Sequence, residues 1–264
     1  MQAYNGLLRG NNLKRVYALL FLLPFWVQAQ TITIHGGDAD NYPWHMEDGT
    51  GLDRILLKMV DKALPEIDIK VAQVPWKRCL INIGSNIIEG CFAASFKEKR
   101  KVFGIYPGGD KPDKSLRIHS SSYSLYILKG SSINVTAKLT ISGLSGKVAA
   151  PAGYSIGDDL IGVGYKVDAG AHATSLNFEK LLMGWVKGVA ALSLNGDNIL
   201  AKNKKYSDKI RVVKTPLIDK PYYLMFSKGF VGSNKALAEK IWHTLGKERE
   251  SSEFKEAAAV FLSK

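Results

Sequence analysis

Hydrophobic and polar residues recur along the first third of the chain with two different periods, which predict strands and helices in turn. Residues 31–34 and 67–71 alternate in steps of two, so each segment predicts a strand. Between them, apolar residues recur at helical spacing from 52 to 63, which predicts a helix that ends before Pro65. The pattern continues with a short helix and a third strand, over residues 77–83 and 90–94.

A second set of strands and helices follows, and two similar aromatic-rich segments enclose it. Residues 122–130 and 221–229 are both predicted to be strands that end in Lys-Gly. The other predicted elements are a strand at 147–150, a helix after Ser155, a helix at 178–183, a strand at 186–192, and helices at 236–245 and 253–262. Strands that alternate with helices predict an α/β fold with a mostly parallel sheet. The order predicts one domain interrupted by another, with two strands that cross between them.

Composition and charge then narrow the class of protein. With 264 residues, 46% hydrophobic and 23% charged, the chain is long enough for a large core and is neither disordered nor collagen-like. Its 36 Lys and Arg against 24 Asp and Glu give a net charge of +12. Basic and acidic residues interleave, as in 97–99 and 247–249, and no RRM, KH or zinc-finger pattern accompanies them. We therefore expect a solvated basic surface and no nucleic-acid partner.

The N-terminal segment has the composition of a signal peptide. Basic residues at 9–15 precede an apolar run at 16–27, and Ala29 stands at the position expected for cleavage. The run is shorter than the roughly 20 apolar residues that cross a bilayer, and Pro24 interrupts it, which disfavours a permanent anchor helix. We expect residues 1–29 to be removed near Ala29 and the mature protein to be exported.

The expected export bears on whether the two cysteines, Cys79 and Cys91, are bonded. An oxidising compartment allows them to form a disulfide. Two buried thiols that act as small hydrophobic residues are an equally open interpretation.

Several short segments occur in the order and spacing of one protein family. They are Tyr42-Pro43-Trp44, Val74-Pro75-Trp76-Lys77-Arg78, Glu89-Gly90-Cys91-Phe92, Ser95 followed by Arg100, and Gly153-Tyr154-Ser155. Over nearly the whole mature chain, the sequence resembles the type 2 periplasmic solute-binding proteins of ABC importers, extracellular family 3. The resemblance implies an α/β, two-domain periplasmic-binding-protein type II fold, with two α/β lobes joined by two crossing strands. It implies a discontinuous first lobe, 30–120 plus 228–264, and a second lobe at 124–220.

The resemblance also implies a ligand site between the lobes. Arg100 is expected to clamp a carboxylate with its planar guanidinium, Ser95 to hydrogen-bond the ligand, and Tyr154 with Ser155 to face it from the second lobe. The residues alone leave two other interpretations open: Arg100 as a solvated base, and Ser155 as part of a helix capping box with Asp158. Aromatic side chains are expected to form an apolar wall around the ligand: Tyr42, Trp44, Trp76 and Phe96.

One position departs from the family pattern. Amino-acid binders of this family hold the α-ammonium with an Asp in the second lobe, and Leu192 stands where that Asp is expected. Asp197 is near in sequence but lies beyond the predicted strand. The resemblance therefore implies a small polar, carboxylate-bearing solute, either an amino acid or a related compound.

The implied function is capture of that solute by domain closure, without catalysis and without a cofactor. Delivery to an ABC permease in the inner membrane is implied by the resemblance as well. We expect a periplasmic monomer.

Two enzymatic alternatives stay open. Residues 153–157 match the Gly-x-Ser-x-Gly pattern, and Asp219 and His243 follow in the order of an α/β-hydrolase, which would make Ser155 the nucleophile of an esterase. A dehydratase built on the binding-protein fold is the other alternative, and it requires a general acid and base in the cleft. The histidines lack the spacing of metal ligands, so no metal site is predicted: His35, His45, His119, His172 and His243.

Overall fold

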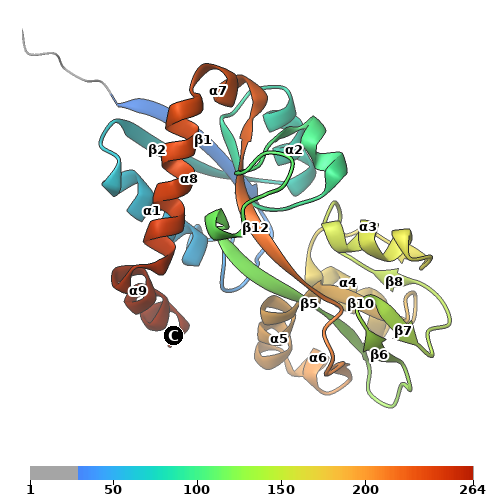
Figure 1. Ribbon diagram of the computed structural model, residues 1–264. Helices are drawn as coiled ribbons and strands as arrows, with labels where there is room; N and C mark the ends of the chain where they lie inside the picture. Colours follow the sequence, from blue (N-terminus) through green and yellow to red (C-terminus); the bar gives the residue numbers. More distant parts are fainter. Residues whose placement is uncertain (1–28, 264) are drawn as a thin grey trace, which may run out of the picture.

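Two strands, β5 (His119–Leu128) and β12 (Ile218–Ser227), cross between two groups of strands and helices and connect them. The computed structural model describes residues 29–263, and Figure 1 shows a lobe on either side of these strands. The predicted signal peptide lies outside the described residues, apart from Ala29.

The first lobe contains β1 (Gln30–Gly37), α1 (Leu52–Ala63), β2 (Ile67–Val74), α2 (Trp76–Gly84), β3 (Gly90–Ser95), the 3-10 helix η1 (Glu98–Val102), β4 (Gly104–Ile105), the 3-10 helix η2 (Lys114–Leu116), α7 (Lys228–Ser233), α8 (Lys235–Glu250) and α9 (Ser252–Leu262). The second lobe contains β6 (Asn134–Ala137), β7 (Thr140–Ser142), β8 (Val148–Ala149), α3 (Ser155–Gly162), β9 (Val167–Asp168), α4 (Thr174–Leu182), β10 (Gly188–Leu192), α5 (Ser193–Lys202), α6 (Lys204–Ser207) and β11 (Ile210–Val212).

One sheet runs through both lobes in the order β2-β1-β3-β12-β5-β10-β8-β9, with β4 beside β12 and β11 beside β5. Within each lobe the strands away from the junction are parallel: β1 with β2 and β3, and β8 with β9 and β10. The crossing strands run antiparallel to each other and to their neighbours. Tyr222 of β12, for example, pairs with His119 of β5 on one side and with Ser95 of β3 on the other. The sheet is therefore mixed, with parallel pairing confined to the two ends.

The core of the first lobe forms between the sheet and two helices that lie side by side, α1 and α8 (Figure 1). α1 buries Leu52, Leu56 and Val60, as its helical spacing predicted, and it buries Leu57 as well. The indole Nε1 of Trp242 on α8 donates to the carbonyl of Leu224 at 2.7 Å, so this large buried side chain has its polar atom satisfied. Burial of each aliphatic side chain contributes about 1.5–3 kcal/mol.

The elements with a strong period were predicted from the sequence, and those that depend on tertiary contacts were not. The helix expected at 52–63 is α1, and the strands expected at 122–130 and 221–229 are β5 and β12. The helix α5 was missed because its sequence contains Gly196, a poor helix former. In the folded chain Gly196 packs on Tyr126, where a Cβ atom would lie 2.3 Å from the ring. A glycine therefore weakens the helix here but allows the Tyr126 ring to pack against it.

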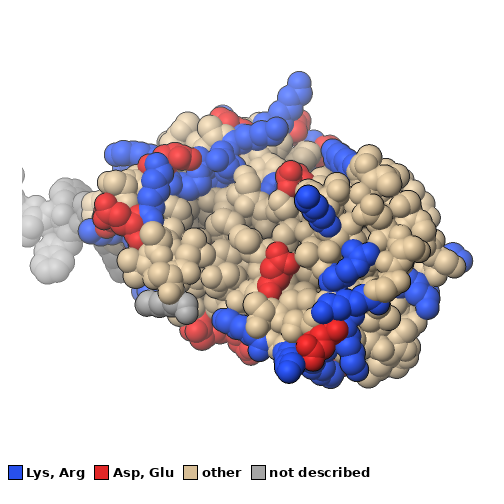
Figure 2. Space-filling model, turned by 90° about the horizontal axis from the view of Figure 1, so that it is seen from below, with Lys and Arg blue, Asp and Glu red and all other residues tan. Residues whose placement is uncertain are grey.

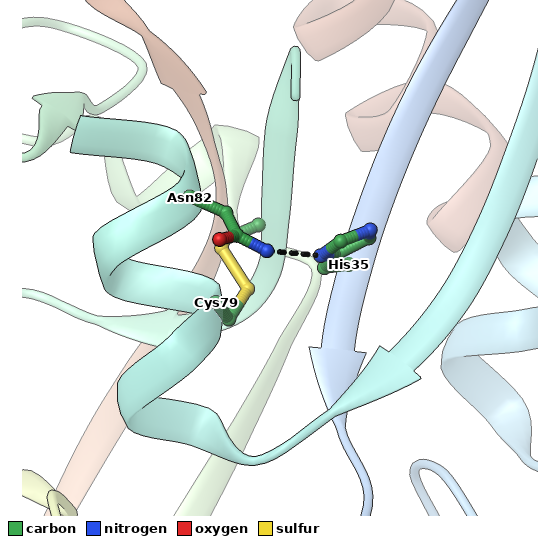
Figure 3. Close-up of a disulfide and its surroundings, with 4 residues drawn as sticks. His35, Cys79 and Asn82 are labelled. Carbon is green, nitrogen blue, oxygen red and sulfur yellow. Dashed lines mark hydrogen bonds between the residues drawn. A yellow bond between two sulfur atoms is a disulfide. The ribbon is translucent and has the colours of Figure 1, made fainter. Parts of the chain in front are cut away.

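A disulfide joins Cys79 on α2 to Cys91 on β3, with the Cα atoms 6.3 Å apart (Figure 3). Both cysteines are fully buried. Beside the disulfide, Asn82 of α2 hydrogen-bonds His35 of β1 at 3.3 Å, which gives α2 a second polar attachment to the sheet. These contacts fix the helix that carries Trp76 at its first position.

Basic and acidic side chains are interspersed on the face shown in Figure 2, and the basic ones are more numerous. This arrangement corresponds to a solvated surface. Within residues 29–263, no helix combines the length and the apolar character needed to cross a membrane.

Replacing both cysteines by alanine should lower the free energy of unfolding by about 3 kcal/mol, because the disulfide closes a loop across 12 residues and restricts the unfolded chain. Urea unfolding with and without a reductant measures this. The reduced parent protein should unfold like the double variant, which should itself be insensitive to the reductant. Equal midpoints for the oxidised parent and the variant would contradict the prediction.

Candidate ligand-binding site

A small cavity of about 20 Å³ lies where the two lobes meet the crossing strands. In this arrangement of the lobes it has room for about one water molecule. Its lining comes from the first lobe (Gly37, Asn41, His45, Trp76, Ala93, Ser95, Arg100), the crossing strands (Tyr123, Tyr222) and the second lobe (Tyr154, Ser155, Leu192). The structure thus brings five of the eight predicted ligand-binding residues to one cavity: Trp76, Ser95, Arg100, Tyr154 and Ser155.

Arg100, on η1 directly after β3, is only 3% exposed and joins the two lobes. Its Nη1 donates to the Ser95 carbonyl at 2.8 Å and to Ser95 Oγ at 3.0 Å, and its Nη2 donates to the Gly153 carbonyl at 2.9 Å. The guanidinium also lies over the Trp76 ring, 5.4 Å from the centroid. Because Arg100 is buried, a solvated base is the wrong interpretation of this residue. Within residues 29–263 no carboxylate forms an ion pair with it.

Gly153 allows the second lobe to approach this closely. Its φ of +77° suits glycine, and a Cβ atom there would lie 3.0 Å from Lys77 Cγ and 3.2 Å from Trp76 Cδ1. The loop carbonyl can therefore reach Arg100.

Ser155 faces the junction and does not cap its helix. The N-cap of α3 is Tyr154, which makes no side-chain cap hydrogen bond, and Ser155 is the first helical residue. Ser155 Oγ accepts hydrogen bonds from Ser95 Oγ and from Lys220 Nζ, each at 2.8 Å. The capping-box interpretation is therefore wrong, and Asp158, its expected partner, instead pairs with Lys99 at 2.6 Å.

Ion pairs hold the lobes together beside the cavity. Asp159 on α3 accepts from Lys97 of the first lobe at 2.6 Å and also contacts Lys220 on β12. Burial lowers the pKa of Lys220, and the hydrogen bond with Asp159 opposes that shift. Lys97 and Lys220 thus share one carboxylate next to the site. With the charge of Arg100 added, the junction is electropositive.

The crossing strands supply aromatic side chains that the sequence analysis did not assign to the site. Tyr222 Oη donates to Tyr123 Oη at 3.0 Å, and both rings are almost fully buried. Burial raises the pKa of Tyr123 from its ordinary value of 10 to about 12. The aromatic enrichment of both strands was the available signal, but their register decides which rings face the cavity.

Three predicted aromatic residues lie outside this cavity lining. Tyr42 stacks towards Phe261 of α9, with 6.2 Å between ring centroids. Trp44 stacks on His119 at 4.0 Å, and Phe96 packs edge-on against Tyr106 at 5.3 Å. These rings are held by partners inside the fold, so the apolar wall consists of Trp76, Tyr154, Tyr123 and Tyr222 instead.

A buried polar network supports the wall behind the cavity. Asp53, in the first turn of α1, contacts His119 Nδ1 at 2.7 Å and lies 3.9 Å from His45 Nδ1. All three side chains are at most 3% exposed. Burial alone would raise the pKa of Asp53, but the attraction and hydrogen bond of His119, with a smaller contribution from the nearby His45, outweigh it and lower that pKa below its ordinary value of 3.8.

Leu192, the last residue of β10, lines the cavity where the family pattern places an Asp. Asp197 lies on α5 and accepts a hydrogen bond from Tyr126 Oη at 2.9 Å, on the side that packs against Phe178. It does not replace the expected carboxylate.

The residues required for an esterase do not converge. Asp219 is exposed and accepts from Ser122 Oγ, while His243 is exposed on α8. The polar partners of Ser155 Oγ are Ser95 and Lys220, and Lys220 Nζ, which donates to Ser155 Oγ, is also paired with Asp159. Among the residues that the structure describes, no cluster of three or more His, Cys, Asp or Glu side chains could hold a metal ion.

Comparison with known proteins gives the fold. No protein-family model matches the chain, and no curated protein matches it. Solved structures do, at low identity: the arginine-, lysine-, histidine-binding protein ArtJ from Geobacillus stearothermophilus is 16% identical with a TM-score of 0.70, covering 89% of this chain and 96% of ArtJ. The GluR0 ligand-binding core from Nostoc punctiforme, in complex with L-glutamate, is 13% identical with a TM-score of 0.68, covering 88% of this chain and all of that one.

An ancestral arginine-binding protein bound to arginine is 21% identical, with a TM-score of 0.67 over 88% of this chain and 97% of that one. The chain has the two-lobed fold of type II periplasmic binding proteins. The α/β, two-lobed fold expected from the sequence is confirmed.

Replacing Asp53 by asparagine should destabilise the protein by about 3–5 kcal/mol near pH 7, because it breaks a buried charged pair. A carboxylate whose pKa is lowered by folding stabilises the protein above its unfolded pKa, and that contribution is lost as the pH falls through the folded value. The difference between parent and variant should therefore shrink below pH 3.8. Denaturant unfolding across pH tests this, with the exposed Glu256→Gln on α9 as the control; a pH-independent difference would contradict it.

Proposed function

We propose that this protein captures a small carboxylate-bearing solute in the cavity between its lobes. The observation that carries the proposal is the buried guanidinium of Arg100, which has no acidic partner within residues 29–263. A guanidinium has five N–H donors, and three hydrogen bonds occupy three of them, so two are left for a ligand. A carboxylate accepts such a fork in a bidentate manner and supplies the missing charge.

The energetics of burial support the same proposal. A charge that is removed from water without a counter-charge costs several kcal/mol, and carbonyl oxygens compensate it only in part. The nearby Lys97, Lys220 and Asp159 add a further net positive charge. An anionic ligand therefore relieves an unfavourable feature of the empty protein, whereas a cationic ligand would increase it.

Closure of the lobes is the proposed mechanism of capture. The cavity takes its lining from both lobes, so a ligand makes its full set of contacts only when they are together. The crossing strands β5 and β12 would act as the hinge, because each pairs with strands of a lobe and with the other.

The cellular setting follows from the resemblance in sequence. We propose a periplasmic monomer, exported with the N-terminal signal peptide, that delivers its solute to an ABC permease in the inner membrane. The similar structures bind amino acids, as their names state, which supports a small-molecule ligand. A binding role without catalysis is the function that the site favours.

Replacing Arg100 by alanine should weaken binding by about 2–5 kcal/mol, about 30-fold or more in Kd, because a carboxylate would be left without its partner. The measurement is calorimetric titration with the carboxylate that stabilises the mature parent protein most in a thermal-shift panel of amino acids, dicarboxylates, oligopeptides and sugars. Arg100→Lys should keep the charge but lose the bidentate geometry, and bind at an intermediate level.

Arg78→Ala is the matched control, because Arg78 is exposed on α2. It should bind like the parent. Thermal unfolding of each variant without ligand separates lost binding from lost folding. Parent-like binding by a folded Arg100→Ala variant would rule out the site.

Replacing Ser155 by alanine should weaken binding by only about 0.5–1.5 kcal/mol, the contribution of one hydrogen bond. The parent should hydrolyse p-nitrophenyl esters no faster than buffer does, since Ser155 has no free base beside it. Turnover by the parent that disappears in Ser155→Ala but persists in Ser207→Ala, a control on α6, would establish the esterase instead.

A further inference from the structure

Apart from Arg100, two side chains of the cavity carry polar atoms that have no partner among the described residues. Asn41 and His45 both line the cavity and are 2% and 3% exposed. Asn41 Oδ1 and both ring nitrogens of His45 lack a hydrogen-bond partner among the described residues. Buried polar atoms without partners are costly, so these side chains indicate where a ligand supplies hydrogen bonds.

The cavity offers no carboxylate to an ammonium group. None of its lining residues is acidic, and Leu192 stands where an Asp would be needed. Asp53 and Asp159 lie nearby but do not line the cavity: Asp53 binds His119 through Oδ1 and lies 3.9 Å from His45 through Oδ2, and Asp159 binds Lys97 and Lys220. Asp38, close enough to influence Tyr154, is not part of the lining.

The aromatic rings do not replace that carboxylate as a site for a cation. Arg100 lies over the Trp76 ring at 5.4 Å, and Lys220 lies over the Tyr123 ring at 5.7 Å. His119 covers one face of Tyr222, with 4.8 Å between the rings. Protein groups thus use these π-systems, and two of the three groups are positively charged, which repels a further cation.

We propose that the ligand is a small hydroxycarboxylic acid and that the corresponding amino acids are rejected. Its carboxylate would pair with Arg100, and its hydroxyl would meet Asn41 and His45. A carboxamide carries donors and an acceptor, an imidazole carries at least one donor, and a hydroxyl both donates and accepts, so it satisfies either side chain without adding charge. This inference rests on the proposed function and names its ligand class.

The test compares compounds that differ in one group. Three sets are titrated into the mature protein by calorimetry: lactate, alanine and propionate; 3-hydroxybutyrate, 3-aminobutyrate and butyrate; mandelate, phenylglycine and phenylacetate. In at least one set the hydroxy acid should bind about tenfold or more tighter than both the amino acid and the compound that lacks the group.

A substitution should reverse the preference. Leu192→Asp places a carboxylate in the cavity wall, and should gain about tenfold or more for the amino acid while losing affinity for the hydroxy acid. Leu192→Asn has nearly the same shape without the charge and should not gain. Asn41→Ala should narrow the gap between the hydroxy acid and its deoxy analogue, and thermal unfolding verifies that each variant folds.

The outcomes distinguish an error in the ligand class from an error in the proposed solute-binding function. Tighter binding of the amino acids by the parent, abolished by Arg100→Ala, would overturn the ligand class and leave the solute-binding function; loss of that preference in Asp38→Asn would locate the ammonium site. No difference between a hydroxy acid and its deoxy analogue would also overturn the ligand class. Failure of every carboxylate, in these sets and in the wider panel, to bind the folded parent would overturn the proposed function itself.

Discussion

The guanidinium of Arg100 is the constraint on which the arrangement of the lobes depends. It is buried, and its hydrogen bonds reach the Ser95 carbonyl in one lobe and the Gly153 carbonyl in the other. A buried guanidinium needs hydrogen-bond acceptors around it, and both lobes supply them. These contacts therefore hold the lobes close together. Gly153 permits the approach, and the Trp76 ring beneath the guanidinium limits its position. The cavity is the space that remains beside this junction.

The crossing strands connect the site residues of the two lobes. Tyr123 on β5 pairs with both Ile218 of β12 and Leu192 of β10, so one backbone position belongs to the connection and to the wall of the cavity. On the other side, Tyr222 pairs with Ser95, which places that serine beside the cavity and within reach of Arg100. Antiparallel pairing therefore sets the relative positions of the site residues from both lobes, and side-chain contacts adjust them.

The sequence predicted the groups of the site that lie at the ends of regular elements. Ser95 ends β3, Trp76 begins α2 and Ser155 begins α3, so their positions followed from periodicity and from the resemblance. Residues whose roles depend on register or on distant partners were not predictable in this way. Tyr222 could be identified only once its pairing with His119 was known, and the sharing of Asp159 between Lys97 and Lys220 joins residues about 60 positions apart. Trp44 lies outside the cavity lining, because an aromatic residue in a loop packs equally well on a buried histidine.

The direct contacts between the lobes bear on how much binding energy the solute must supply. Lys97–Asp159, Lys99–Asp158 and the hydrogen bond from the Tyr42 amide to Asn195 Oδ1 at 3.2 Å join the lobes without a ligand. A ligand shifts a conformational equilibrium only by its difference in affinity for the two states. Because the protein supplies part of the closing interaction, a ligand with few polar groups is sufficient to complete it. A small acid held by one arginine, without an ammonium anchor, is consistent with lobes that already contact each other around it.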